Sequence, residues 1–210
     1  MLILIVASTE MEIAPFLAEF PQADYLITGV GAPIAIYKLT KQLQVKAYDC
    51  IIQVGIAGTY HQVFQLGDVV LVERDCFADL GVVENQQFYS VFDMGFAVSE
   101  DFPFKAEWLV NENISSFDIN AKSVKGATVN LLFDQHQLPI ENKKKIAADI
   151  ETMEGAALHY VALAENIKFV QIRGISNYVG ERDKTKWTIQ TAVESSNQLL
   201  SQLYRKLIQK

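Results

Sequence analysis

The most regular pattern in the chain is a series of short apolar runs rich in leucine, isoleucine and valine. Several runs are apolar throughout instead of alternating with polar residues, which is typical of strands that are buried on both faces. Such strands occur in sheets that helices cover on both sides, so the runs predict an α/β protein. The predicted strands cover residues 2–7, 25–29, 50–55, 68–72, 123–130 and 169–175.

Helical spacing of apolar residues appears between some of these runs, and it predicts helices over residues 10–20, 32–43 and 153–166. The C-terminal segment is the clearest helix, because its apolar residues form one stripe that is interrupted only at Ser196. We expect this helix to cover the sheet. The stripe consists of Ile189, Ala192, Val193, Leu199, Leu200, Leu203, Tyr204 and Leu207.

Length and composition fit one domain with a substantial core, because the chain has 210 residues and half of them are hydrophobic. We therefore assign residues 1–210 to a single domain. The formal net charge is −7, and the 18 basic residues form no block beyond Lys143, Lys144 and Lys145. Binding to a phosphate backbone needs concentrated positive charge, so we expect no nucleic-acid partner.

The first seven residues are apolar and follow no positive charge. They are too few to span a bilayer and lack the basic flank of a signal peptide, so they predict a buried first strand and no membrane partner. Cys50 and Cys76 have no Cys-x-x-Cys spacing, and His61, His136 and His159 are scattered. We expect no metal site and a protein of the reducing cytoplasm.

Gly29-Val30-Gly31 follows a predicted strand and precedes a predicted helix, which invites comparison with a dinucleotide-binding turn. The third glycine of that motif is missing, and Pro33 stands at the start of the helix. A tight turn explains the glycines equally well, so we reject a nicotinamide-dependent oxidoreductase.

Candidate chemistry begins with Glu10 and Glu12, directly after the first predicted strand. Ser8 or Thr9 is suited to cap a helix there, and glutamates in a first helical turn favour the helix dipole. The functional alternative is that one of the two carboxylates is a general base at the end of the strand.

Two further motifs stand in the last third of the chain: Met153-Glu154-Gly155-Ala156-Ala157 and Arg173-Gly174-Ile175-Ser176-Asn177. About twenty residues separate Glu154 from Arg173, enough for a helix, a turn and a strand, which can bring both to one edge of a parallel sheet. A carboxylate among small residues at a helix start is costly unless it is paired or binds a ligand. Glu154 can accept hydrogen bonds from both hydroxyls of a sugar diol, and Asn177 can read the edge of a heterocycle.

These motifs resemble the purine nucleoside phosphorylase/nucleosidase superfamily, and the similarity extends over nearly the whole chain. The resemblance implies a three-layer α/β/α fold with a central mixed, largely parallel twisted sheet, and a homo-oligomer whose subunits complete each other's pockets. Residues 54–58 resemble the glycine-rich sheet segment of the superfamily, and Glu12 falls where its nucleosidases keep the glutamate that activates water.

The resemblance also implies a role for each candidate residue, in a reaction that needs neither a metal nor an organic cofactor. Glu12 would activate water, with help from Arg173, and Asn177 would steady the leaving base. Residues expected to bind the nucleoside are Ile56, Ala57, Gly58, Thr128, Val129, Met153 and Glu154.

Two features narrow the reaction to the hydrolysis of a 6-oxopurine nucleoside. Phosphorolysis needs cations for phosphate, yet no Lys or Arg precedes Lys38 and none lies between Cys50 and Val72. Methylthioadenosine/S-adenosylhomocysteine nucleosidases have an acidic aspartate where this chain has Asn177, and an amide cannot protonate adenine. Residues 77–81 and 173–183 most resemble the futalosine hydrolase family of menaquinone biosynthesis, which implies release of hypoxanthine from futalosine.

Two alternatives stay open. One is a methylthioadenosine/S-adenosylhomocysteine nucleosidase that releases adenine. The other is a nucleoside-binding protein without turnover, although the presence of both Glu12 and Glu154 argues against it.

The charged loop at residues 180–186 is either a solvated loop or a segment that closes over substrate. Its cations Arg182, Lys184 and Lys186 are candidates for binding the carboxylate of futalosine, as is a cation from another subunit. The aromatic-rich segment 77–123 is either core or a partner surface.

Overall fold

The computed structural model describes residues 1–134 and 147–209, so His136 and the three lysines at 143–145 lie outside the described residues. The main sheet contains β1 (Ile3–Ala7), β2 (Tyr25–Ile27), β3 (Cys50–Thr59), β4 (Val69–Asp75), β7 (Leu109–Val110), β8 (Lys122–Thr128), β9 (Ile150–Thr152) and β10 (Lys168–Tyr178). A separate hairpin consists of β5 (Gly81–Glu84) and β6 (Gln87–Ser90). The helices are α1 (Glu10–Glu19), α2 (Ala32–Val45), α4 (Gly155–Ala164) and α5 (Ile189–Ile208), with short 3₁₀ turns at Ile114–Phe117 and Lys184–Lys186.

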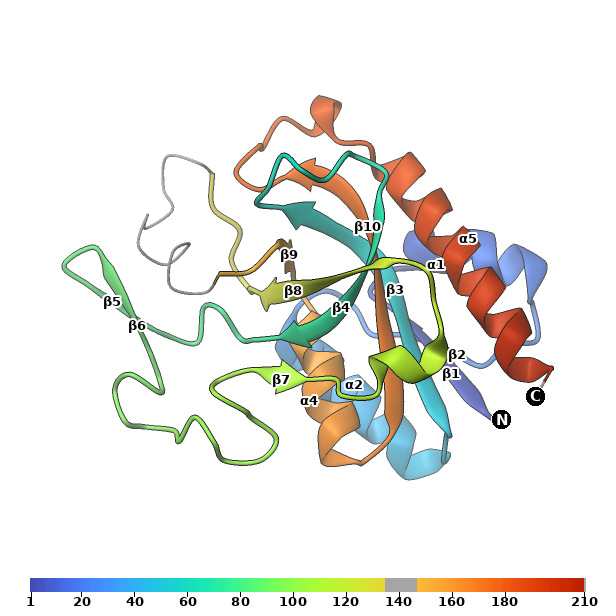
Figure 1. The fold of residues 1–210 in the computed structure, drawn as a ribbon, viewed down its shortest axis with the longest axis horizontal. Coiled ribbons are helices and arrows are strands. Elements are labelled where there is room, and N and C mark those ends of the chain that lie inside the picture. The colour runs from blue at the N-terminus through green and yellow to red at the C-terminus, as the bar shows by residue number, and fades with distance from the viewer. Residues whose placement is uncertain (135–146, 210) are drawn as a thin grey trace.

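The main sheet is mixed and partly closed. Its order is β10-β4-β8-β9-β3-β1-β2, with β7 beside β4, and β10 pairs with β3 as well as with β4 (Figure 1). The strands β10, β4, β8, β9 and β3 therefore form a ring, from which β1 and β2 continue as an open parallel extension. The antiparallel pairs are β10–β4, β3–β9 and β4–β7, and the other pairings of this sheet are parallel.

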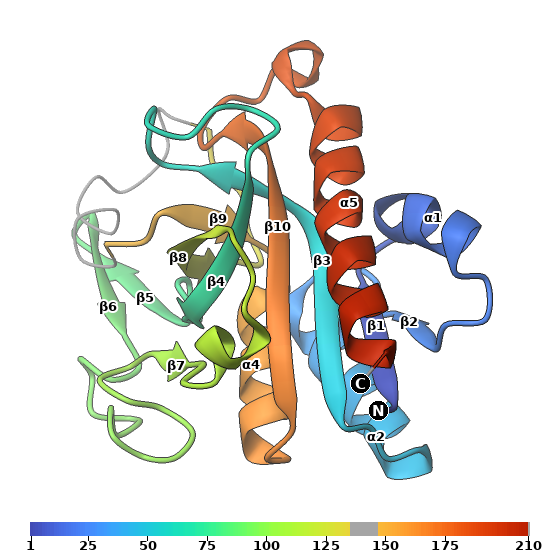
Figure 2. The ribbon, with the colours of Figure 1, turned by 45° about the vertical axis from the view of Figure 1, so that its right-hand side comes forward.

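Helices cover the two faces of the sheet, as expected from the unbroken apolar strands. On one face, α1 and α5 pack on β1, β3 and β10 through a cluster that includes Ile13, Phe16, Leu200 and Leu203. On the other face, Leu39 of α2 and residues of α4 pack against the same strands. Figure 2 shows α5 and α1 together on one side of β3 and β10. The predicted three-layer α/β/α fold is confirmed.

The predicted elements agree with the observed ones except in the middle of the chain and near residue 150, where the short strand β9 was not predicted. The aromatic-rich segment contains β5, β6, β7 and a 3₁₀ turn, none of which the sequence pattern predicted. Phe88 and Phe117 of this segment are buried, whereas Phe96 and Phe102 are exposed, so it contributes both core and surface. No helix among the described residues is long and apolar enough to cross a membrane.

Candidate active site

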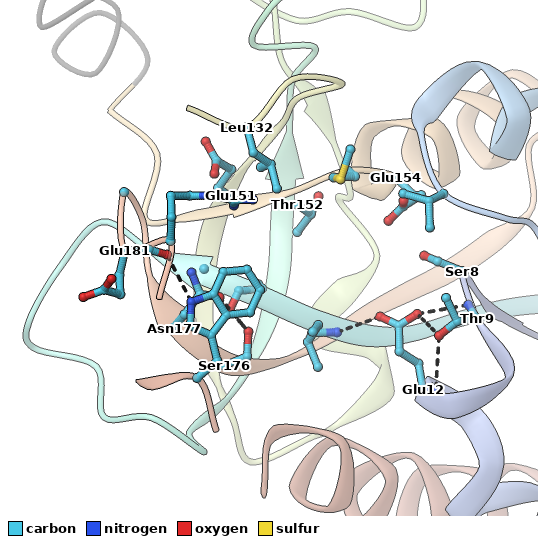
Figure 3. A pocket seen from close by; sticks show the side chains of 18 of the residues that line it. Ser8, Thr9, Glu12, Leu132, Glu151, Thr152, Glu154, Ser176, Asn177 and Glu181 are labelled. Carbon is cyan, nitrogen blue, oxygen red and sulfur yellow. Dashed lines mark hydrogen bonds between the residues drawn. The ribbon is translucent and has the colours of Figure 1, made fainter. Parts of the chain in front are cut away.

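A cavity of about 230 Å³ opens where β1, β3 and β10 end, on the edge of the sheet at which α/β proteins commonly bind ligands (Figure 3). Segments distant in the sequence meet there: the β1–α1 junction, β3, β9, the start of α4 and the end of β10. The lining residues are Ser8, Thr9, Met11, Glu12, Val30, Ile56, Ala57, Gly58, Leu132, Phe133, Glu151, Thr152, Met153, Glu154, Ser176, Asn177, Gly180, Glu181, Arg182 and Trp187.

Glu12 lies at one wall of the cavity, in the first turn of α1, and is buried. Thr9 is the N-cap of this helix and forms a capping box with Glu12, in which the carboxylate accepts hydrogen bonds from Thr9 N and Thr9 Oγ1, both at 3.0 Å. Its second oxygen accepts from Ile56 N of β3 at 3.2 Å. The helix cap and the neighbouring strand thus hold the carboxylate in one orientation at the cavity.

Glu154 lies at the start of α4, as the N-cap residue, and its side chain does not cap the helix. Instead its Oε1 accepts a hydrogen bond of 2.8 Å from Gly31 N, in the turn between β2 and α2. Burial raises the pKa of Glu154, while the nearby Arg173 charge and the Gly31 amide act in the opposite direction. The Gly29-Val30-Gly31 turn therefore holds the Glu154 carboxylate through the Gly31 amide.

The start of α4 is fixed by two threonines, of which Thr152 lines the cavity and Thr128 lies beneath it. Thr128 Oγ1 accepts from Ala156 N at 2.7 Å, and Thr152 Oγ1 accepts from Gly155 N at 3.2 Å. The first N–H groups of a helix have no partner within the helix, and the Glu154 side chain does not cap them. The two threonine hydroxyls accept from two of these N–H groups instead. They fix the backbone that carries Glu154.

Asn177 lies opposite Glu154 and comes from the end of β10 (Figure 3). Its Oδ1 accepts a hydrogen bond from Ser176 Oγ at 2.8 Å, and its Nδ2 donates to Tyr178 O at 3.1 Å. The Ser176 bond orients the amide, and the NH2 group retains a second proton to donate. Gly58 leaves room beside it, since a Cβ there would approach Val179 Cγ2 to 3.0 Å and Asn177 Nδ2 to 3.2 Å.

The structure brings most of the predicted site residues together. Those that line the cavity are Glu12, Ile56, Ala57, Gly58, Met153, Glu154, Asn177 and Arg182. Thr128 and Val129 are buried beneath it and are not part of its lining, and neither is Lys184 in its 3₁₀ turn. Lys186 pairs with Glu181 at 2.6 Å and does not line the cavity either. Of the three loop cations, Arg182 alone is a lining residue.

Arg173 is 1% exposed and lies behind the cavity wall. A Cβ at Gly55 would collide with Arg173 Nη1 and come within 2.8 Å of Glu12 Oε1, so the glycine allows both side chains to lie over the same strand. Arg173 Nη2 donates to Gln53 Oε1 at 2.7 Å. The guanidinium contributes positive charge near both Glu12 and Glu154 without lining the cavity.

A buried polar network supports Arg173 from below. With its NH2 group facing His159 and Asp75, the Gln171 amide donates to His159 Nε2 at 2.9 Å and to Asp75 Oδ2 at 3.3 Å, and its oxygen accepts from Arg173 Nε at 3.1 Å. His159 Nδ1 then donates to Leu109 O at 2.9 Å, and because Nε2 accepts from Gln171, the imidazole is neutral. Burial agrees with this assignment, because it lowers the pKa of His159 to about 4.

Asp75 gives this network a measurable pH dependence. Burial raises the pKa of Asp75 from 3.8 to about 6, against the opposing effects of Thr128 and Arg173. The folded protein therefore binds more protons than the unfolded chain between these values, and the Asp75 contribution to stability falls as pH rises through this window. The difference between the folded and unfolded pKa of Asp75 corresponds to about 3 kcal/mol of unfolding free energy over the whole window.

Asp75→Asn removes this titration. We expect the free energy of unfolding of the wild type, minus that of the variant, to increase by about 2 kcal/mol between pH 7 and pH 4, where the unfolded Asp75 carboxyl is itself partly protonated. The lowered pKa of His159 makes both proteins less stable on acidification between pH 6.5 and 4. This contribution is common to the wild type and the variant, so it cancels in the difference. Urea unfolding over a pH series measures this quantity, and a difference that is independent of pH would contradict the assignment.

Several lining residues were missed by sequence reasoning. Leu132 and Phe133 follow the segment expected to pack on the base, and Trp187 follows the charged loop. Trp187 Nε1 donates to Glu181 O at 3.0 Å, and the Arg182 guanidinium lies 5.6 Å from its ring centre. The described residues contain no group of three His, Cys, Asp or Glu side chains that could hold a metal ion.

A family model described as the phosphorylase superfamily matches residues 25–208. The chain belongs to the phosphorylase superfamily. The matched region of this superfamily member contains Glu154, Arg173 and Asn177 and begins after Glu12.

The chain is also similar to individual known proteins. Futalosine hydrolase from Thermus thermophilus is 28% identical over 210 residues, which cover 91% of this chain and 90% of that protein. A 5′-methylthioadenosine/S-adenosylhomocysteine nucleosidase from Buchnera aphidicola is 21% identical over 173 residues, covering 77% and 71% of the two chains. The structure of futalosine hydrolase from Helicobacter pylori has the same fold, with a TM-score of 0.79, 14% identity and 97% coverage of both chains.

Proposed function

We propose that this protein is a futalosine hydrolase, which cleaves the N-glycosidic bond of futalosine in menaquinone biosynthesis and releases hypoxanthine and dehypoxanthine futalosine. The observation that carries the proposal is the convergence of two buried carboxylates, Glu12 and Glu154, on one cavity that Asn177 borders on another side. The similarity to the Thermus thermophilus enzyme over nine-tenths of both chains supports the choice of substrate.

Glu154 has the position to hold the ribose and to stabilise charge. As the N-glycosidic bond stretches, positive charge develops on the sugar ring, and a fixed carboxylate lowers the energy of that transition state. Gly31 N and Arg173 favour the ionised form that this role requires, against the effect of burial. Met153 is the neighbouring lining residue and supplies an apolar contact for the sugar.

Glu12 serves as the general base. It takes a proton from water as the oxygen bonds to C1′ and the C1′–N bond breaks, with the bonding electron pair leaving on the base. Thr9 and Ile56 keep the carboxylate oriented, and Arg173 beside it supports the charge of the ionised site. We assign no metal or organic cofactor to this reaction.

Asn177 favours a 6-oxopurine as the leaving group. Its NH2 group donates to N7 or O6 of hypoxanthine, and the departing base takes its proton from solvent. The Ser176 bond to Oδ1 supports this assignment, because it orients the amide without using its NH2 group. An amide has no acidic proton to transfer to adenine, so the same residue argues against efficient adenine release.

The second candidate is a methylthioadenosine/S-adenosylhomocysteine nucleosidase, which the similarity to the Buchnera aphidicola enzyme favours. Chromatography separates the two after incubation in phosphate-free buffer with futalosine or with methylthioadenosine. Hypoxanthine from futalosine alone supports the proposal. Adenine from methylthioadenosine, with futalosine intact, overturns it and leaves the ribose chemistry in place, while turnover of neither nucleoside favours a binding protein.

Arg182 is our candidate for binding the carboxylate of futalosine, because it lines the cavity and lies over Trp187. We expect Arg182→Gln to raise KM for futalosine about fivefold with little change in kcat, as for other exposed ion pairs. The effect should shrink at high salt and vanish with the carboxamide analogue of futalosine. Steady-state kinetics with both compounds measure it, and an equal change for the two would contradict carboxylate binding.

We further infer that the protein acts in the cytoplasm as a homo-oligomer of single-domain subunits. The exposed side chains of Phe96 and Phe102 in the aromatic-rich segment support an interface between copies. Light scattering of the purified protein tests the oligomeric state, and a monomer at working concentrations would exclude it.

A further inference from the structure

Ser8 is the residue of the cavity that neither the fold nor the mechanism above uses. It is 4% exposed, lines the cavity, and follows the last residue of β1. The cap of α1 is provided by Thr9, so Ser8 does not have the capping role that a serine before a helix usually has. Its main chain is fixed independently, because Ser8 O accepts a hydrogen bond from Gly29 N at 3.1 Å.

The Ser8 hydroxyl is buried without a hydrogen-bond partner. Within the described residues, only Ser8 Oγ and Arg74 Nε are buried side-chain polar atoms in this condition, and Arg74 Nε still lies 3.4 Å from Glu73. Leaving a hydroxyl unpaired in a protein interior is costly, so such groups in native proteins usually have a partner or a function. The unpaired Ser8 hydroxyl is aimed into a cavity built to bind a ligand.

Its surroundings indicate which part of a ligand it meets. In Figure 3 the Ser8 hydroxyl points into the space between Glu12 and Glu154. It lies near the Glu154 carboxylate, whose pKa it lowers, yet it makes no hydrogen bond of ordinary geometry with it. The Glu12 carboxylate already accepts hydrogen bonds from Thr9 and Ile56. The carboxylate beside Ser8 is therefore that of Glu154, which we assign to the sugar.

We propose that Ser8 binds the sugar together with Glu154, by donating a hydrogen bond to the oxygen of one ribose hydroxyl. A ribose hydroxyl that donates to Glu154 keeps two lone pairs on its oxygen. These lone pairs lose their hydrogen bonds to water when the substrate fills the cavity. Glu154 can only accept, so a donor is needed beside it, and Ser8 supplies one. Ser8 thereby contributes to the selection of a ribosyl over a deoxyribosyl substrate. This inference rests on the proposed nucleosidase function.

The test compares the Ser8→Ala variant with the wild type on futalosine, 2′-deoxyfutalosine and 3′-deoxyfutalosine. We expect Ser8→Ala to lower kcat/KM about tenfold for futalosine and for one deoxy compound. For the deoxy compound that lacks the contacted hydroxyl, the two proteins should agree within about twofold. Each comparison uses one substrate, so the intrinsic reactivity of that substrate cancels.

Two controls separate this role from a general loss of function. Ser201→Ala removes a buried serine of α5 outside the cavity and should leave all three rates unchanged. Ser8→Cys keeps the approximate size of the side chain with only a weak donor, so it replaces Ser8→Ala if the alanine variant fails to fold, and it should show the same substrate-dependent loss. Equal losses on all three substrates, or no loss on any, would overturn the role of Ser8.

Failure of the proposed function gives a different result. If the wild type leaves futalosine intact and releases adenine from methylthioadenosine, the substrate assignment fails. The same comparison with the 2′-deoxy and 3′-deoxy forms of methylthioadenosine then still decides whether Ser8 contacts a sugar hydroxyl.

Discussion

Glu12→Gln should lower kcat for futalosine hydrolysis about a thousandfold, with KM within about threefold of the wild-type value. Glutamine keeps the size and the buried position of the side chain, but its amide cannot accept a proton from water. Substrate binding depends on Glu154 and the other lining residues, which the substitution does not touch. Steady-state release of hypoxanthine, followed by chromatography, gives both constants.

The matched control for this variant is Glu10→Gln, in the same helical turn but exposed to solvent. It removes an equal charge and should leave kcat within about twofold of the wild type. Because Glu12→Gln also places an NH2 group among the donors Thr9 N and Ile56 N, its thermal unfolding must be measured alongside. Equal losses in the two variants, or unimpaired turnover by Glu12→Gln, would exclude Glu12 as the base.

The layers of the fold could be predicted from the sequence because burial on both faces leaves a direct record in the strands. Leu4, Ile5, Ile51 and Ile52 are fully buried, and no polar alternation was needed to identify their strands. The closure of the sheet could not be predicted from the pattern of apolar residues. Strand β9 has three residues, and β10 pairs with both β3 and β4 through backbone atoms, whose partners side-chain patterns do not encode.

The candidate site was predictable where one side chain had an uncommon setting. Glu154 stood out because a carboxylate preceded Gly155 and Ala156, and the structure shows why Gly155 carries no side chain. A Cβ at Gly155 would collide with Asp75 Oδ2 and with the side-chain amide of Gln171. Thr128 was expected against the base, whereas the structure places it beneath the cavity, where its hydroxyl donates to Asp75 and accepts from Ala156 N. The sequence pattern located its segment but could not tell which face of β8 the side chain occupies.

Glu154→Gln is expected to lower kcat/KM for futalosine by a factor of about 300, because a neutral amide neither stabilises the developing positive charge nor accepts from both sugar hydroxyls. Both kcat and KM should change, in contrast to Glu12→Gln, since Glu154 contacts the sugar before and during bond cleavage. Glu165→Gln at the other end of α4 is exposed and should retain wild-type kinetics.

Stability should move in the opposite direction to activity. Burial raises the pKa of Glu154, so the ionised carboxylate is a destabilising feature of the folded state that the neutral amide lacks. At pH 7 the variant should therefore unfold at a temperature no lower than the wild type. Its advantage should shrink on acidification, because the folded wild type takes up a proton at a pH above 4.5, where the unfolded chain is still ionised. A variant that lost both activity and stability would indicate that Glu154 holds the fold together and would remove the reason to assign it the substrate.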